Sequence, residues 1–213
     1  MVEKDPQVAA VWKTIVNGDS EWLANRITSF EMTLETATAE LEKKAKTVRE
    51  IAFQTIIKNR TFHGGILADG SGFLKHGEAG RGVLSRWYPT TIAQRIKEIG
   101  IISHKIKFVE GDAFEVMKEY ERRKSALFFI DPPYTAGGKK AGSRLYTHWE
   151  LDHEKLFSAC ERLKGEFLLT YDVADEVVAL AKKHTFQYRA IPMKNTHHAE
   201  MDELLISGDL TWI

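Results

Sequence analysis

The chain has 213 residues, 43% hydrophobic and 28% charged, which is the composition of an ordinary globular protein. This composition excludes disordered and collagen-like classes, and no apolar run approaches the ~18 residues needed to cross a bilayer. The net charge is zero, yet residues 58–107 carry nine basic and three acidic side chains, and this net +6 is a weak indication of a polyanionic partner.

The N-terminal half is expected to be helical. Asp5 followed by Pro6 is typical of a helix start, and Thr47 with Glu50 forms a capping box that opens a further helix. The first helix is expected to end at Gly18. Apolar residues at helical spacing predict helices over residues 6–16, 20–30, 33–46 and 48–60.

A glycine-rich segment follows these helices. Seven of the chain's fifteen glycines lie between Gly64 and Gly82, among basic and aromatic residues. A loop of ~30 residues without regular structure is unusual in a compact domain and is more often functional or disordered. Its basic and aromatic content favours a function.

The second half alternates between strand and helix patterns. After a helix from Pro89 to Gly100, we expect strands over residues 105–110, 126–130, 166–171, 186–191 and 203–213, and helices over residues 112–123, 152–164 and 174–184. This alternation predicts an α/β fold with a mainly parallel sheet and helices on both faces.

The stretch FFIDPPY, residues 128–134, ends a buried strand on a polar, rigid turn. In an open α/β sheet, ligands bind beyond the carboxyl ends of the strands, where Asp131 falls. Pro132 and Pro133 supply carbonyl acceptors without backbone donors, and Tyr134 supplies a flat ring. This combination suits a planar group bearing an amine, which would stack on the ring while Asp131 and Pro132 accept its hydrogens.

Several stretches of the sequence resemble the Dam-like D12 class of amino-methyltransferases. They are DPPY, FVEGDAFEVM, VEKD, NRTFHGGILADGSGF, LDHEKL after LYTHW, and NTHHAEMDELLI. The resemblance covers nearly all of the chain. It implies a bacterial or phage-type enzyme that flips adenine out of double-stranded DNA and methylates its exocyclic amine with S-adenosylmethionine, as restriction–modification methylases do. Asp at the first motif position favours adenine, whereas Ser favours cytosine.

The resemblance also implies roles for individual residues. The catalytic motif is Asp131, Pro132, Pro133 and Tyr134. The cofactor contacts are Asp5, at the ribose hydroxyls, Asp112 with the adjacent Ala113, at the adenine amine, and Asp131. A helix-cap role competes for Asp5 and Asp112, because aspartate opens helices routinely. The candidate DNA contacts are Asn59, Arg60, Arg86, Lys139, Lys140 and Arg144. No zinc or other metal site is indicated.

We expect a class I methyltransferase-like catalytic domain over residues 1–13 and 106–213, with a mostly helical DNA-recognition lobe inserted over residues 14–105. Only MVEK precedes Asp5, and no later strand leads through a glycine-rich turn into a helix. The first strand of the fold, which holds the cofactor's methionine end, is therefore expected to be missing. A second chain or an N-terminal segment would complete the cofactor site.

Three alternatives remain open on the sequence. The chain could be a DNA-binding fragment that has lost catalysis, a methyltransferase for RNA or protein, or a cytosine amino-methyltransferase. No signal-peptide hydrophobic region begins the chain, and the single cysteine, Cys160, fits a reducing compartment. We expect a cytoplasmic location, and we expect Cys160 to be a packed core thiol.

Overall fold

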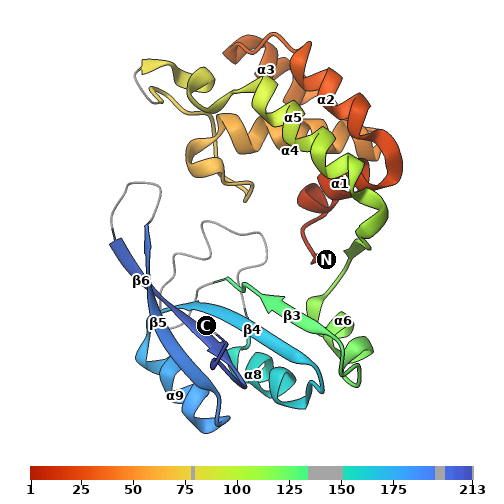
Figure 1. The fold of residues 1–213 in the computed structure, drawn as a ribbon. Helices are drawn as coiled ribbons and strands as arrows, with labels where there is room; N and C mark the ends of the chain where they lie inside the picture. The colour runs from red at the N-terminus through yellow and green to blue at the C-terminus, as the bar shows by residue number, and fades with distance from the viewer. Residues whose placement is uncertain (78–79, 134–150, 195–199, 213) are drawn as a thin grey trace. The chain divides into compact units, whose positions relative to one another are not determined.

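The structure, a computed structural model, describes residues 1–77, 80–133, 151–194 and 200–212. These residues form two compact units, one from the described residues of 1–112 and one from those of 113–212 (Figure 1). The protein is mixed α/β with a small mixed sheet. None of the helices in the described ranges is both long enough and apolar enough to span a membrane.

The first unit is mainly helical. Its helices are α1 (Pro6–Thr14), α2 (Ser20–Thr28), α3 (Leu34–Glu42), α4 (Val48–Thr61) and α5 (Pro89–Ile101), with the π-helical turn η1 (Ile15–Asp19) and the 3-10 turns η2 (His63–Gly65), η4 (Gly82–Arg86) and η5 (Ser103–Lys105). Two short strands, β1 (Val2–Glu3) and β2 (Val109–Glu110), pair in parallel.

The predicted helix starts are confirmed. The Asp5 carboxylate accepts from the backbone N–H groups of Gln7 and Val8 at the start of α1. Thr47 and Glu50 form the expected capping box at the start of α4. The chain kinks between α1 and α2, where Gly18 has a φ of +98°, a left-handed conformation that only glycine adopts without strain.

Apolar faces of α1, α2, α4 and α5 form the core of the first unit. Leu23, Ile27, Phe53 and Ile57 are fully buried there. Burial of each such side chain contributes roughly 1.5–3 kcal/mol. The described part of the glycine-rich segment has little regular structure beyond η2, η4 and an isolated bridge.

The second unit contains one sheet. Its elements are α6 (Ala113–Tyr120), β3 (Leu127–Ile130), α8 (His153–Arg162), β4 (Glu166–Asp172), α9 (Asp175–Lys183), β5 (Gln187–Lys194) and β6 (Glu200–Ser207). The strand order is β3-β4-β6-β5, with β3 and β4 parallel and the other two pairings antiparallel.

This sheet corrects two expectations. It is mixed rather than mainly parallel, because β6 runs antiparallel to both of its neighbours. The strand expected over residues 203–213 covers only the first part of that range, because a turn follows Ser207. In that turn the Asp209 carboxylate accepts from the backbone N–H and the hydroxyl of Thr211.

The two units do not follow the expected division at residues 105/106. Residues 1–13 cluster with the helical unit, and the boundary falls between Asp112 and Ala113. The assignment of residues 1–13 to a catalytic domain therefore stays a prediction.

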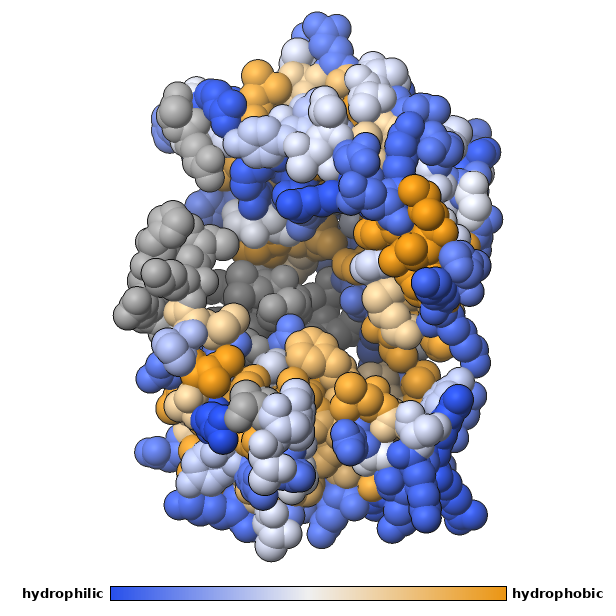
Figure 2. Space-filling model, in the orientation of Figure 1, coloured by the Kyte–Doolittle hydropathy of each residue, from blue (hydrophilic) through white to orange (hydrophobic). Residues whose placement is uncertain are grey.

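The expectation of helices on both faces is also corrected, because the described helices of the second unit pack on one face of its sheet. Phe167 and Leu169 of β4 point to the face covered by α6, α8 and α9, and the register places Phe128 and Ile130 of β3 on that face too. Leu127 and Phe129 point to the other face and are 66% and 69% exposed. In Figure 2, hydrophobic side chains gather over the region where β3 and β4 lie.

Candidate active site

Asp131 follows β3 directly and lies at the carboxyl end of the parallel pair β3–β4. The register pairs Ile130 with Leu169, so the next residues along the two strands are Asp131 and Thr170. The Thr170 hydroxyl donates to Asp131 Oδ1 over 2.8 Å. Because Thr170 is only 7% exposed, it is a fixed support for an exposed carboxylate.

Pro132 and Pro133 continue from Asp131 and are half-buried. Neither has a backbone N–H, so this stretch offers carbonyl acceptors without local donors. Tyr134 lies outside the described residues, as do Lys139, Lys140 and Arg144. The acceptor part of the expected motif is therefore described, and its aromatic part is not.

A histidine–tyrosine pair lies at the same end of β4. Tyr171 is fully buried, and its hydroxyl is 2.8 Å from Nδ1 of His153, the first residue of α8. Burial lowers the pKa of His153, and the negative charges of Glu176 and Asp152 oppose that shift. The Asp152 carboxylate caps α8 by accepting from the Lys155 backbone N–H, as the sequence predicts.

Asp5 and Asp112 occupy equivalent places in the first unit. The β1–β2 register pairs Glu3 with Glu110, and each aspartate lies two residues beyond its strand. Both carboxylates therefore follow the carboxyl ends of neighbouring parallel strands. Asp5 caps α1, and Asp112 Oδ2 accepts from Lys4 Nζ over 3.0 Å, so each also has a structural role. Ala113 begins α6 and is exposed.

The expected DNA contacts at Asn59, Arg60 and Arg86 come together in the first unit. Arg86 Nη2 donates to the backbone carbonyls of Asn59, at 3.1 Å, and Phe62, at 2.5 Å. Asn59 Nδ2 in turn donates to the Gly65 carbonyl over 3.1 Å. Arg86 is thus an anchor for the end of α4, where a positive charge is favourable next to the last carbonyls.

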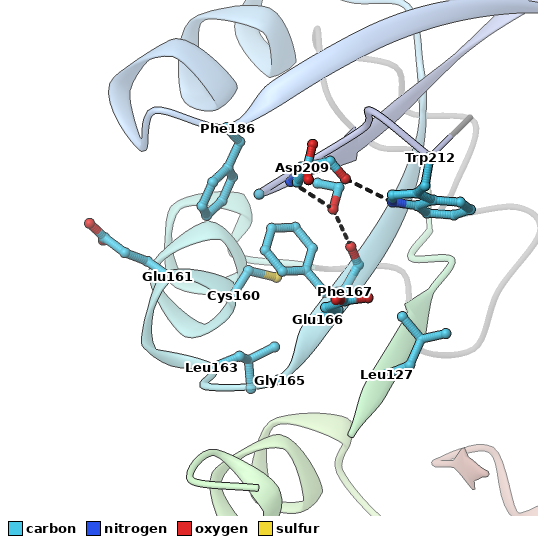
Figure 3. Close-up of a pocket in the computed structure, with 12 residues that line it drawn as sticks. Leu127, Cys160, Glu161, Leu163, Gly165, Glu166, Phe167, Phe186, Asp209 and Trp212 are labelled. Atoms are coloured by element: carbon cyan, nitrogen blue, oxygen red, sulfur yellow. Dashed lines mark hydrogen bonds between the residues drawn. The ribbon is translucent and has the colours of Figure 1, made fainter. Parts of the chain in front are cut away.

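A hollow in the second unit lies at the opposite end of the sheet from Asp131. It encloses about 300 Å³ near the starts of β3 and β4, and Figure 3 shows Leu127, Glu166 and Trp212 around it. The Trp212 indole N–H donates to the Asp209 carbonyl over 2.9 Å and holds the C-terminal turn over this end. The hollow therefore has no part in chemistry at Asp131.

Reasoning from the sequence missed Thr170, His153 and Tyr171. A polar TYD sequence at the end of the buried strand after β3 was the available signal. The TYD sequence does not identify Asp131 as the partner of Thr170, because that contact depends on the strand register.

No model of a known protein family matches the sequence, and comparison with curated proteins found no match. The resemblance to the Dam-like class therefore stays a prediction.

Proposed function

We propose that this chain belongs to a Dam-like S-adenosylmethionine-dependent methyltransferase that methylates the exocyclic amine of adenine in double-stranded DNA. The observation that carries the proposal is the pair of acceptors at the end of β3, Asp131 and Pro132, with Asp131 held by the nearly buried Thr170. A rigid acceptor pair beyond a strand end is what recognition of a planar amine requires.

In the proposed reaction, the Asp131 carboxylate and the Pro132 carbonyl accept the two amine hydrogens of a flipped adenine. These bonds favour the tetrahedral nitrogen that attack needs and stabilise the positive charge that grows on it. When bound, S-adenosylmethionine would supply the methyl group to this nitrogen, and its sulfonium sulfur would leave as a neutral thioether. The nitrogen then loses its surplus proton to solvent. Tyr134 replaces the lost base stacking, worth ~1–3 kcal/mol.

The carboxylates of the first unit fit the polar groups of the cofactor's nucleoside. Asp5 would accept from ribose hydroxyls, and Asp112, next to Ala113, from the adenine amine. Carboxylates are acceptors only when ionised, so they suit these hydroxyl and amine donors. Lys4 already donates to Asp112 Oδ2 and would help hold that carboxylate in place.

The described strands do not supply a site for the methionine end of the cofactor. None of them is followed by a glycine-rich turn leading into a helix. Within the described sheet, β3 pairs with β4 alone, so its other edge can accept a further strand. We propose that a second chain, or an N-terminal segment outside residues 1–213, supplies that strand and completes the cofactor site.

A tritiated-methyl transfer assay on duplex DNA tests the proposal, followed by nucleoside analysis of the product. We expect N6-methyladenine with the completed enzyme and no incorporation with Asp131→Ala, whose fold should persist because Asp131 is exposed. Full incorporation by Asp131→Ala would reject the catalytic role. Methylcytosine in the DNA would favour the cytosine alternative. Methyl incorporation into RNA or protein, offered as substrates in the same assay, would favour those two substrate classes.

DNA binding without methyl transfer by the completed protein would favour the alternative of a DNA-binding fragment that has lost catalysis. Circular dichroism melts of wild type and Asp131→Ala provide the folding control for all of these assays.

A further inference from the structure

Three arginines of the first unit, Arg60, Arg86 and Arg95, form what we call the arginine cluster. Arg60 lies in the last turn of α4, one turn after Ile56, and Arg95 lies in α5, one turn after Ile92. Ile56 and Ile92 are buried in the same core. Residues one turn apart share a helix face, so Arg60 and Arg95 each emerge beside a residue of that core.

Arg86 has a fixed place in this cluster. Its guanidinium is held by the Asn59 and Phe62 carbonyls, and a Cβ added at Gly65 would lie 3.3 Å from its Nη1. Its Nε is buried and has no hydrogen-bond partner among the residues described. Arg86 therefore brings a full positive charge to the end of α4, next to Arg60.

None of the three guanidinium groups pairs with a carboxylate of the described chain. Arg26 and Arg49, elsewhere in the same unit, do form such pairs, with Glu40 and Asp19. Glu98, three residues after Arg95, accepts instead from Gln94 Nε2 over 2.9 Å.

The three charges also act on one another. The pKa of Arg60 is lowered, first by burial and then by the positive charges of Arg86 and Arg95. Like charges held together without a counter-ion destabilise the folded state, and an anion bound among them would relieve that repulsion. The arginine cluster therefore favours the binding of a negatively charged ligand.

We propose that Arg60 and Arg95 together bind one backbone phosphate of duplex DNA, with Arg86 behind them as a fixed supporting charge. This inference rests on the proposed function for its ligand and adds Arg95 to the DNA contacts. The planar guanidinium fork matches phosphate oxygens and donates two parallel hydrogen bonds, which a lysine ammonium cannot do.

The test is duplex binding by the full chain, measured by fluorescence anisotropy at several salt concentrations without methyl donor. Each phosphate contact contributes about 0.9 to the slope of log affinity against log salt. Arg60→Gln and Arg95→Gln should each weaken binding with a small change in slope, because the remaining arginine still meets the phosphate. The double variant should lower the slope by about 0.9.

Arg122→Gln is the matched control, because it removes one exposed arginine charge from the second unit. Arg60 is half-buried, so Arg95→Glu, at an exposed position, provides a second disruption that does not threaten the core. The single-phosphate site would be overturned if the double variant left the salt slope unchanged or lowered it by about twice 0.9. It would also be overturned if Arg122→Gln weakened DNA binding as much as the cluster variants do.

Further arms separate the possible ligands. Calorimetry with inorganic phosphate tests a site for free phosphate, and a matched RNA duplex tests the other nucleic acid. The DNA assignment would be overturned if the arginine variants weakened binding only of inorganic phosphate or only of the RNA duplex. Methyl transfer with no arginine effect rejects the cluster alone, whereas an arginine effect without methyl transfer rejects only the catalytic proposal.

Discussion

The Thr170 hydroxyl donates to Oδ1 of Asp131 over 2.8 Å, across the parallel register of β3 and β4. A threonine that is almost buried and belongs to the sheet thereby fixes the orientation of an exposed carboxylate that belongs to a turn. Orientation matters for the proposed chemistry, because Asp131 has to face the amine while the adjacent Pro132 carbonyl accepts from it.

We expect Thr170→Val to lower kcat for methyl transfer by ~10- to 100-fold with little change in KM, since a misplaced catalytic group reduces the rate more than binding. Thr170→Ser keeps the hydroxyl and should recover most of the rate. In an Asp131→Ala background, Thr170→Val should have no further effect. Steady-state kinetics with the completed enzyme measure this, and a wild-type kcat for Thr170→Val would contradict the positioning role.

The predictions from sequence that succeed are those fixed by neighbouring residues. Asp5, Thr47 and Asp152 cap their helices as expected, because each cap bonds to backbone groups two or three residues further along. The burial of Cys160 was also predictable from apolar residues at helical spacing. Local chemistry specifies these features without knowledge of the tertiary structure.

The features that sequence did not predict depend on the strand register and on pairing between distant segments. The contacts Thr170–Asp131 and His153–Tyr171 join residues 39 and 18 positions apart. The antiparallel course of β6 likewise follows from pairing rather than from any pattern within the strand. Alternating apolar residues indicate a strand, but not its neighbour or its direction.

His153 should make stability depend on pH. Burial lowers its folded-state pKa, so on acidification the unfolded chain takes up the proton first. The stabilisation is complete above the unfolded pKa of about 6.5 and is lost as pH falls through it towards the lower folded value. Urea unfolding of wild type and His153→Gln across this range should give a flatter profile for the variant. Parallel profiles would contradict this.

The Cys160 thiol should be unreactive in the folded protein. Its side chain is buried, and burial raises its pKa to about 12, so almost no thiolate exists at pH 8. We expect a thiol reagent to modify the native chain only at the rate of unfolding, and to react at once in denaturant. Cys160 is the single cysteine, so the denatured chain is its own control. Rapid modification of the native chain would show that the α8 region opens readily.

The edge of β3 should promote self-association of the isolated chain. Leu127 and Phe129 are large, apolar and mostly exposed, on a strand that pairs on one side only within the described sheet. Such an edge favours pairing with other chains, and a lysine placed there opposes it. Sedimentation velocity over a range of concentrations should show association for wild type and less for Phe129→Lys. Equal association by the two would place the contact elsewhere, and Leu84→Lys, at an exposed apolar site of the first unit, is the matched control.

Residues 1–213 alone should bind the cofactor weakly. In the proposed site Asp5 and Asp112 would offer acceptors to the cofactor's nucleoside, but no described strand supplies the glycine-rich turn that would hold its methionine end. Calorimetry of the purified chain with S-adenosylmethionine should therefore show affinity weaker than micromolar, and the methyl-transfer assay little turnover. S-adenosylhomocysteine should bind about as weakly, because it shares the unsupported end. Micromolar affinity with full turnover would mean that these residues form a complete cofactor site, and the proposed additional strand at β3 would then be wrong.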